Sequence, residues 1–193
     1  MNVYLDGEFA FGLSRITAAW LQVGQEISDD KIEELRNADG IEVAYQQALK
    51  FMSYRPRSEQ EVRQNLIKHD VIGDNLNRVI ERLQYNGYID DKRFAQIWVE
   101  NRNEHRPRSK RMLAYELRQH GIEQNTIEQI TDGLDEYDLA QQAARKQVQK
   151  YKKLEWIDFQ KKLFGFLSRR GFNYQTSKLI VDQTWEELRS EEY

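Results

Sequence analysis

Apolar residues recur every three or four positions from about residue 41 onward, with polar residues between them. This spacing predicts amphipathic helices, because residues three and four apart share one face of a helix. The pattern then repeats at a shift of 51 residues, the distance from Arg55 to Arg106. The shift pairs Val62 with Leu113, Leu66 with Leu117, Val71 with Ile122, Leu76 with Ile127, Val79 with Ile130, and Leu83 with Leu134. One helical unit is therefore written twice.

A third copy matches the second at a shift of 50 residues. It pairs Leu113, Leu117, Gly121, Ile122 and Ile130 with Leu163, Leu167, Gly171, Phe172 and Ile180. We interpret the chain as three-helix units over 43–89, 90–136 and 137–193. We expect a mainly all-α fold of three tandem three-helix repeats in an elongated, curved array, since units of ~50 residues bury too little surface to stand alone. A radius of gyration near ~16 Å, typical of a compact globule of this length, would contradict the array.

The N-terminal region, 1–42, carries a β pattern. In NVYLDGEFAFGL (Asn2–Leu13) apolar residues alternate on both sides of Asp6-Gly7, a dipeptide favoured in two-residue type I′ hairpins. We therefore expect a β-hairpin. Short helices should follow near 15–22 and 29–37, because each stretch begins after a serine that can cap it.

Composition restricts the setting of the protein. The chain has 39% hydrophobic and 32% charged residues, with a mean hydropathy of −0.85, which predicts a thin core and a highly charged surface. It has no cysteine, which excludes disulfides and favours a reducing, cytoplasmic location. The N-terminal residues lack the pattern of a signal peptide, and no apolar run approaches the ~20 residues that span a bilayer. We expect a cytoplasmic monomer without membrane contact.

Charge is segregated along the chain although the net charge is only −3. The segments Arg102–Arg111 and Arg145–Lys153 each hold five Lys or Arg residues, with one acid in the first and none in the second. Ser28–Leu35 and the C-terminal residues are mostly acidic. Such segregation is typical of binding surfaces, and solvated helix faces would give the same composition.

Both prolines of the chain lie in one tetrapeptide, Arg-Pro-Arg-Ser, at 55–58 and again at 106–109. Proline disfavours helix in the residue before it, so each copy should end one helix and set the start of the next. The serine is a preferred N-cap. In the first copy Glu61 follows Ser58 by three residues, which predicts a capping box.

The second copy continues with Lys110, Arg111 and Met112, so cations occupy the first helical turn, where the helix dipole disfavours them. Together with Arg106 and Arg108 they surround the N–H groups of a helix N-terminus without any acid. We interpret this turn as an anion site, for nucleic-acid phosphate or for acidic side chains of a protein partner. The alternative is that the cations extend into solvent.

No metal site, cofactor site or catalytic group is predicted. The three histidines lack partners at metal-binding spacing, and no phosphate loop or nucleophile motif occurs. Tyr54 and Tyr151 lie beside basic residues and are candidates for stacking on single-stranded bases, although interface packing would look the same. Five aromatic residues at helical spacing are expected in the core: Phe94, Trp98, Phe164, Phe166 and Phe172.

Four segments resemble the RecX family, bacterial regulators of the RecA recombinase. They are ALKFMSYRPRSEQEVRQNL (Ala48–Leu66), GYIDDKRFAQIWVENR (Gly87–Arg102), ELRQHGI (Glu116–Ile122) and KLFGFLSRRGFNY (Lys162–Tyr174). The N-terminal hairpin resembles that of longer members. The similarity spans essentially the whole chain, and the tandem three-helix units of the family agree with the repeats.

The resemblance implies a non-enzymatic protein without cofactors. Such a protein binds RecA filaments on single-stranded DNA, lies in the filament groove, and inhibits RecA ATPase, strand exchange and filament growth. It thereby modulates recombination, DNA repair and the SOS response. The implied partners are the RecA filament and single-stranded DNA, with double-stranded DNA as a second form.

Basic residues of the two segments, of the first Arg-Pro-Arg-Ser copy and of the second and third repeats are expected to contact RecA or DNA phosphate. These are Arg55, Arg57, Arg106, Arg108, Lys110, Arg111, Arg118, Lys150, Lys152, Lys153, Arg169 and Arg170. Two alternatives stay open. The chain is either a DNA-binding helical module that acts without RecA, or a helical scaffold for an acidic protein partner.

Overall fold

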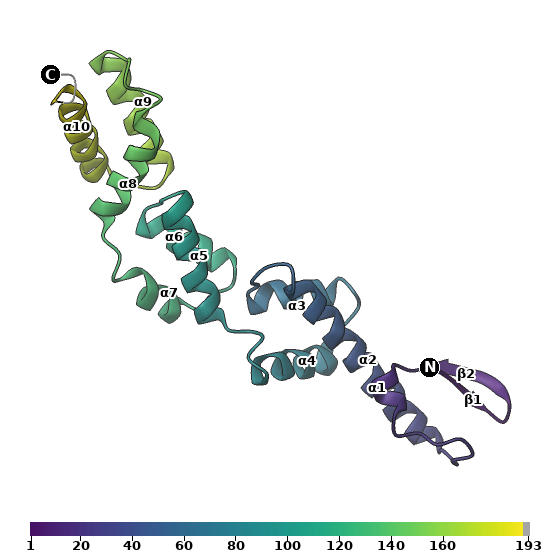
Figure 1. Cartoon of the computed structure of the whole chain (residues 1–193). Coiled ribbons are helices and arrows are strands. Elements are labelled where there is room, and N and C mark those ends of the chain that lie inside the picture. The colour runs from purple at the N-terminus through teal and green to yellow at the C-terminus, as the bar shows by residue number, and fades with distance from the viewer. Residues whose placement is uncertain (191–193) are drawn as a thin grey trace. The chain divides into compact units, whose positions relative to one another are not determined.

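The computed structural model describes residues 1–190 and is mainly helical (Figure 1). The end of the third predicted repeat, 191–193, lies outside the described residues. Two compact units make up the chain, Met1–Asp90 and the residues from Asp91 onward. No helix within 1–190 is long and apolar enough to cross a membrane.

The N-terminal hairpin is confirmed. Strands β1 (Asn2–Leu5) and β2 (Glu8–Gly12) pair antiparallel, with Leu5 opposite Glu8. Asp6 and Gly7 have φ of 49° and 88°, the left-handed conformation that a type I′ turn requires at both positions. The inner face packs in a small core of Phe11, Leu13 and Ala18, with Ile32 among its partly buried neighbours.

Helix α2 (Asp29–Met52) corrects the prediction of a short helix over 29–37. It starts at the Ser28 cap and runs through Gly40 without a break. Glycine weakens a helix, but the C-terminal half of α2 buries Ala44, Tyr45 and Ala48 in the core. The boundary predicted at 42/43 therefore lies inside α2. Helix α1 (Arg15–Ala18) is in turn shorter than the predicted 15–22.

The first repeat consists of the second half of α2 with α3 (Glu59–Ile67) and α4 (Gly73–Tyr85). Their shared core holds Val62, Leu66, Val79 and Leu83, each with 0% exposure. These are positions that the 51-residue shift identifies as repeated.

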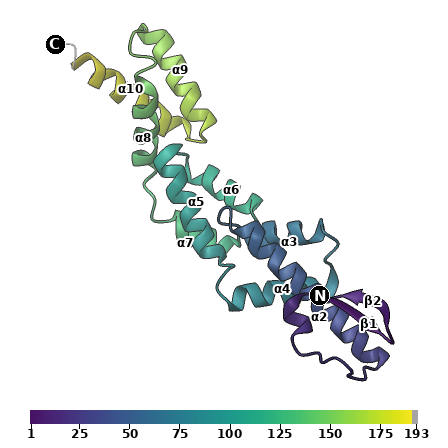
Figure 2. The same cartoon turned by 45° about the vertical axis from the view of Figure 1, so that its right-hand side comes forward.

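The second unit contains two further three-helix groups, each with its own core. The first group is α5 (Asp91–His105), α6 (Lys110–Gln119) and α7 (Gln124–Thr131). The second is α8 (Glu136–Val148), α9 (Trp156–Arg169) and α10 (Tyr174–Ser190), which lie together in Figures 1 and 2. Leu113, Leu117, Leu163 and Leu167 are fully buried. The predicted fold class, three three-helix repeats after a hairpin, is confirmed.

The three repeats share one backbone turn after their second helix. Asp70, Gly121 and Gly171 occupy it, with φ of 62°, 78° and 91°. The next residue of each donates its N–H to the carbonyl five residues back, with N···O distances of 3.1, 3.1 and 3.3 Å. This is the hydrogen bond of a Schellman motif, in which a left-handed residue ends the helix. In the third repeat the turn places Arg170 and Gly171 against the second Arg-Pro-Arg-Ser copy.

Candidate functional site

The first Arg-Pro-Arg-Ser turn pairs Arg55 internally, while Arg57 Nε is buried without a hydrogen-bond partner among the described residues. Ser58 and Glu61 form the predicted capping box, with both N···O distances 3.3 Å. Arg55 donates to both carboxylate oxygens of Glu61, at 2.6 and 3.1 Å. Arg57 lies over the Phe51 ring at 3.9 Å from its centroid. Burial and the charge of Arg55 lower the pKa of Arg57, whereas Glu61 raises it.

The second turn is capped differently. Ser109 accepts from the Met112 N–H at 3.1 Å, as a cap should. The Lys110 N–H donates to Glu136 Oε2 at 2.9 Å, and Lys110 Nζ donates to the Asp132 carbonyl at 3.1 Å. The expectation of a helix N-terminus without an acid is therefore wrong. The acid comes from α8, 26 residues along the chain, where a pattern confined to one helical turn does not reach.

Three donors converge on the carboxylate of Glu116 in α6. Trp98 Nε1 and Arg102 Nε, both from α5, donate to Oε2 at 2.8 Å each. Arg108 Nη1 lies 2.5 Å from Oε1. The Glu116 side chain is only 11% exposed, so this arrangement fixes Arg108 against the helices of the second repeat.

The end of α9 contacts the same turn from the third repeat. The Ser109 N–H donates to the Arg170 carbonyl at 3.1 Å, and Arg170 Nη1 donates to the Pro107 carbonyl at 3.3 Å. Gly171 is buried, and a Cβ there would lie 2.4 Å from Ser109 Oγ. The close approach thus requires glycine at 171, where the left-handed φ favours it as well.

We call Arg102, Arg106, Arg108, Arg170 and Glu116 the junction cluster. Burial lowers the pKa of Arg170, and the charges of Arg108, Arg106 and Arg102 lower it further, whereas Glu116 raises it. Arginine stays protonated in proteins, so the lowered pKa reports an unfavourable environment for its charge. Four cations with one carboxylate leave this junction strongly positive, which suits it to anionic partners.

The other residues predicted to contact RecA or DNA differ in whether they have partners within the described chain. Arg106 and Arg111 are exposed, and neither guanidinium has an ionic or hydrogen-bond partner within residues 1–190. Arg118 Nε donates to Gln124 Oε1 at 3.0 Å. Exposed side chains at the end of α9 and in the turn between α8 and α9 complete the set: Arg169, Lys150, Lys152 and Lys153.

The five aromatic residues predicted in the core are buried to different extents. Phe94 and Phe172 are buried, while Trp98, Phe164 and Phe166 are partly buried against cores. Tyr54 is exposed and stays a candidate for base stacking. Tyr151 instead packs on the core of the third repeat, and its hydroxyl accepts from Gln147 Nε2 at 3.0 Å.

Three residues of the site were missed from the sequence: Arg102, Glu116 and Glu136. Arg102 carried a signal, because it opens the basic segment Arg102–Arg111. Glu116 and Glu136 carried none, because their roles depend on how helices pack.

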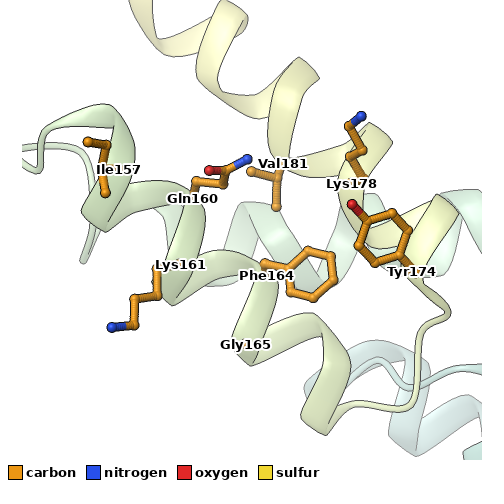
Figure 3. A pocket seen from close by; sticks show the side chains of 8 residues that line it. All are labelled: Ile157, Gln160, Lys161, Phe164, Gly165, Tyr174, Lys178 and Val181. Carbon is orange, nitrogen blue, oxygen red and sulfur yellow. The ribbon is translucent and has the colours of Figure 1, made fainter.

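A separate shallow pocket of ≈ 380 Å³ lies between α9 and α10 (Figure 3). Its apolar lining includes Ile157, Phe164, Tyr174 and Val181. Lys161 stands at the rim, and in Figure 3 its amino group points away from the apolar residues. Among the described residues, no carboxylate or histidine lines the pocket, so it has the character of a surface for an apolar side chain.

Known proteins share this organisation. The RecX family models for the first, second and third three-helix domains match residues 44–83, 90–130 and 135–178, in that order. The chain belongs to the RecX family. "Regulatory protein RecX" of Geobacillus thermodenitrificans is 33% identical over 167 residues, which span 83% of this chain and 61% of that protein. The Bacillus subtilis protein of the same name is 29% identical, over 94% of this chain and 71% of its own length.

Solved RecX structures share the fold. A crystal structure of regulatory protein RecX aligns over 94% of both chains, with a TM-score of 0.75 and 24% identity. RecX from Lactobacillus salivarius covers 77% of this chain, with a TM-score of 0.65 and 24% identity. These similarities show that the chain shares the fold of the solved RecX structures.

Proposed function

We propose that this RecX-family chain binds RecA filaments on single-stranded DNA and inhibits RecA ATPase, strand exchange and filament growth. It would thereby modulate recombination and DNA repair as a non-enzymatic cytoplasmic regulator. The observation that carries the proposal is the match to all three RecX domains in their family order. The name "Regulatory protein RecX" of its relatives agrees with a regulatory role.

The second Arg-Pro-Arg-Ser turn is our proposed contact region. Arg106 and Arg111 are exposed cations without partners in the described chain, so both remain available to carboxylates of RecA or to DNA phosphates. Arg108 and Lys110 are held by Glu116, Glu136 and Asp132. They would position the turn and contribute charge rather than make the first contact.

The direct test is DNA-dependent ATP hydrolysis by RecA. We expect the protein to lower the hydrolysis rate at amounts below one copy per RecA, because a groove-bound protein that blocks filament growth affects many protomers. Unchanged hydrolysis at equimolar protein would contradict the proposal. RecA alone on the same single strand is the reference.

The second candidate function is a DNA-binding module that acts without RecA. It is favoured by the exposed Lys150, Lys152 and Lys153, which lie in one turn. Phosphate contacts would make affinity for single strands fall steeply with salt. Titration of a labelled single strand with and without RecA separates the two functions. Binding that needs RecA supports the first, and equal salt-dependent binding without RecA supports the second.

A further inference from the structure

The junction cluster has more hydrogen-bond donors than residues 1–190 satisfy. Each guanidinium has five N–H donors, yet the structure engages one nitrogen of Arg102, one of Arg108 and one of Arg170. Arg108 Nε is buried without a hydrogen-bond partner in the described part of the chain, as is the equivalent Arg57 Nε, so the difference between the two turns rests on Arg106. The Arg106 guanidinium is exposed and has none there.

The cluster also forms only when two repeats dock. Arg102, Arg106 and Arg108 belong to the second repeat, whereas Arg170 is brought to them by the end of α9. The backbone bond from Ser109 to Arg170 and the close approach of Gly171 hold the repeats together here. Docking therefore gathers like charges, which opposes the same contact.

From this geometry we propose that a phosphate-type oxyanion binds between Arg106, Arg108 and Arg170 and stabilises the docking of the third repeat on the second. Guanidinium groups bind such oxyanions with paired N–H···O bonds. The anion would supply the negative charge that Glu116 alone does not. Because its donors come from both repeats, it binds the docked form and shifts the equilibrium toward it.

The first Arg-Pro-Arg-Ser turn shows why the site is specific to the second. There Glu61 holds Arg55 through both carboxylate oxygens. The position equivalent to Glu61 is Met112, three residues after Ser109. An external oxyanion would take the place that this internal carboxylate occupies in the first repeat.

The test uses the purified full chain without RecA or DNA, so its outcome is independent of the proposed function. Hydrogen exchange of the Ser109 amide reports docking, because that amide donates to the Arg170 carbonyl. Exchange is compared in sodium pyrophosphate and in sodium chloride of equal ionic strength. We expect protection to rise about tenfold when pyrophosphate is at ten times its dissociation constant.

Variants locate the effect. Arg106→Gln, at an exposed position, should reduce the pyrophosphate response, whereas the matched Arg55→Gln should leave it unchanged. Met112→Glu supplies the missing carboxylate, so it should raise protection without pyrophosphate and weaken the response. Arg106→Gln keeps the test valid even where Met112→Glu disturbs packing.

Three outcomes would overturn the inference. They are equal protection in the two salts, a response that survives Arg106→Gln, and a rise of similar size across both units, which would indicate general ion exclusion. A short oligothymidylate at the same phosphate concentration identifies the source. Stronger protection by the oligonucleotide assigns the site to nucleic-acid phosphate, and stronger protection by pyrophosphate assigns it to a free phosphate compound.

Discussion

The two Arg-Pro-Arg-Ser turns have the same four residues and different surroundings. In the first, the Ser58 N–H donates to Glu61 within its own helix. In the second, where Met112 replaces the glutamate, the Ser109 N–H donates to Arg170 of the next repeat. The two turns thus differ at this position and in the acceptor of the serine N–H, which lies in the same helix in the first and in the next repeat in the second. The loss of that carboxylate also leaves Arg106 without the partner that Arg55 has.

The largest effect should come from adding a side chain at Gly171, where the third repeat contacts the second. Gly171→Ala places a Cβ 2.4 Å from Ser109 Oγ at a φ of 91°. We expect the free energy of unfolding of the second unit to fall by about 3 kcal/mol, combining left-handed strain and overpacking. Urea unfolding followed by circular dichroism measures it.

Gly87→Ala is the matched control for Gly171→Ala. Its φ is 70° and nothing lies within 4 Å of the added Cβ, so it should cost only about 1–2 kcal/mol. Equal losses for the two variants would show that the contact between Gly171 and Ser109 does not restrict the docking.

Removing the buried carboxylate should have the next largest effect. Glu116→Gln removes the negative charge of a carboxylate that accepts hydrogen bonds from Trp98 and Arg102 and pairs with Arg108. We expect a loss of about 2 kcal/mol, because charge-assisted bonds become neutral and an amide N–H₂ faces arginine donors. The matched Glu61→Gln keeps its capping box and should cost less than about 1 kcal/mol. If Glu61→Gln lowered the free energy of unfolding more than Glu116→Gln in the same urea titration, the proposed difference between the two turns would be wrong.

Substitution of the two capping serines should have a smaller effect. Ser58→Ala and Ser109→Ala each remove a cap worth about 1 kcal/mol. Only Ser109→Ala should also relieve Gly171→Ala, since it deletes the hydroxyl that the new methyl group would meet. A double-mutant cycle measures this coupling. Strict additivity at 109 and 171 would exclude the direct contact.

The smallest effect concerns the acid stability of the first repeat. Burial would raise the pKa of Glu42, but hydrogen bonds from Gln46 and Arg82 and the charge of Arg82 outweigh it and lower the pKa. Glu42 therefore adds stability above its ordinary pKa of about 4.3, lost as the pH falls through the lowered value. In Glu42→Gln, the fall in the free energy of unfolding between pH 6 and pH 3 should be smaller by a few tenths of a kcal/mol. An unchanged acid limb in urea unfolding at pH 3–6 would contradict the assignment.

Much of the fold was predictable because its signals are local. The shift of 51 residues located the buried leucines, and Asp6-Gly7 located the hairpin turn. The length of α2 was not predictable from Gly40 and its neighbours, because burial of Ala44, Tyr45 and Ala48 overrides weak local propensity. The basic turn was identified, but its counter-charges were not, since Glu116 and Glu136 reach it only through tertiary packing.

The most direct test of the account compares inhibition of RecA ATP hydrolysis by two charge-matched variants. Arg106→Gln with Arg111→Gln removes two exposed cations that have no partner within residues 1–190, and Arg55→Gln with Lys68→Gln removes two cations of the first repeat, one before and one after α3. We predict that the first pair needs roughly tenfold more protein than wild type for half-maximal inhibition, and that the second pair inhibits like wild type. Equal weakening of both pairs, or no inhibition by wild type, would contradict the account.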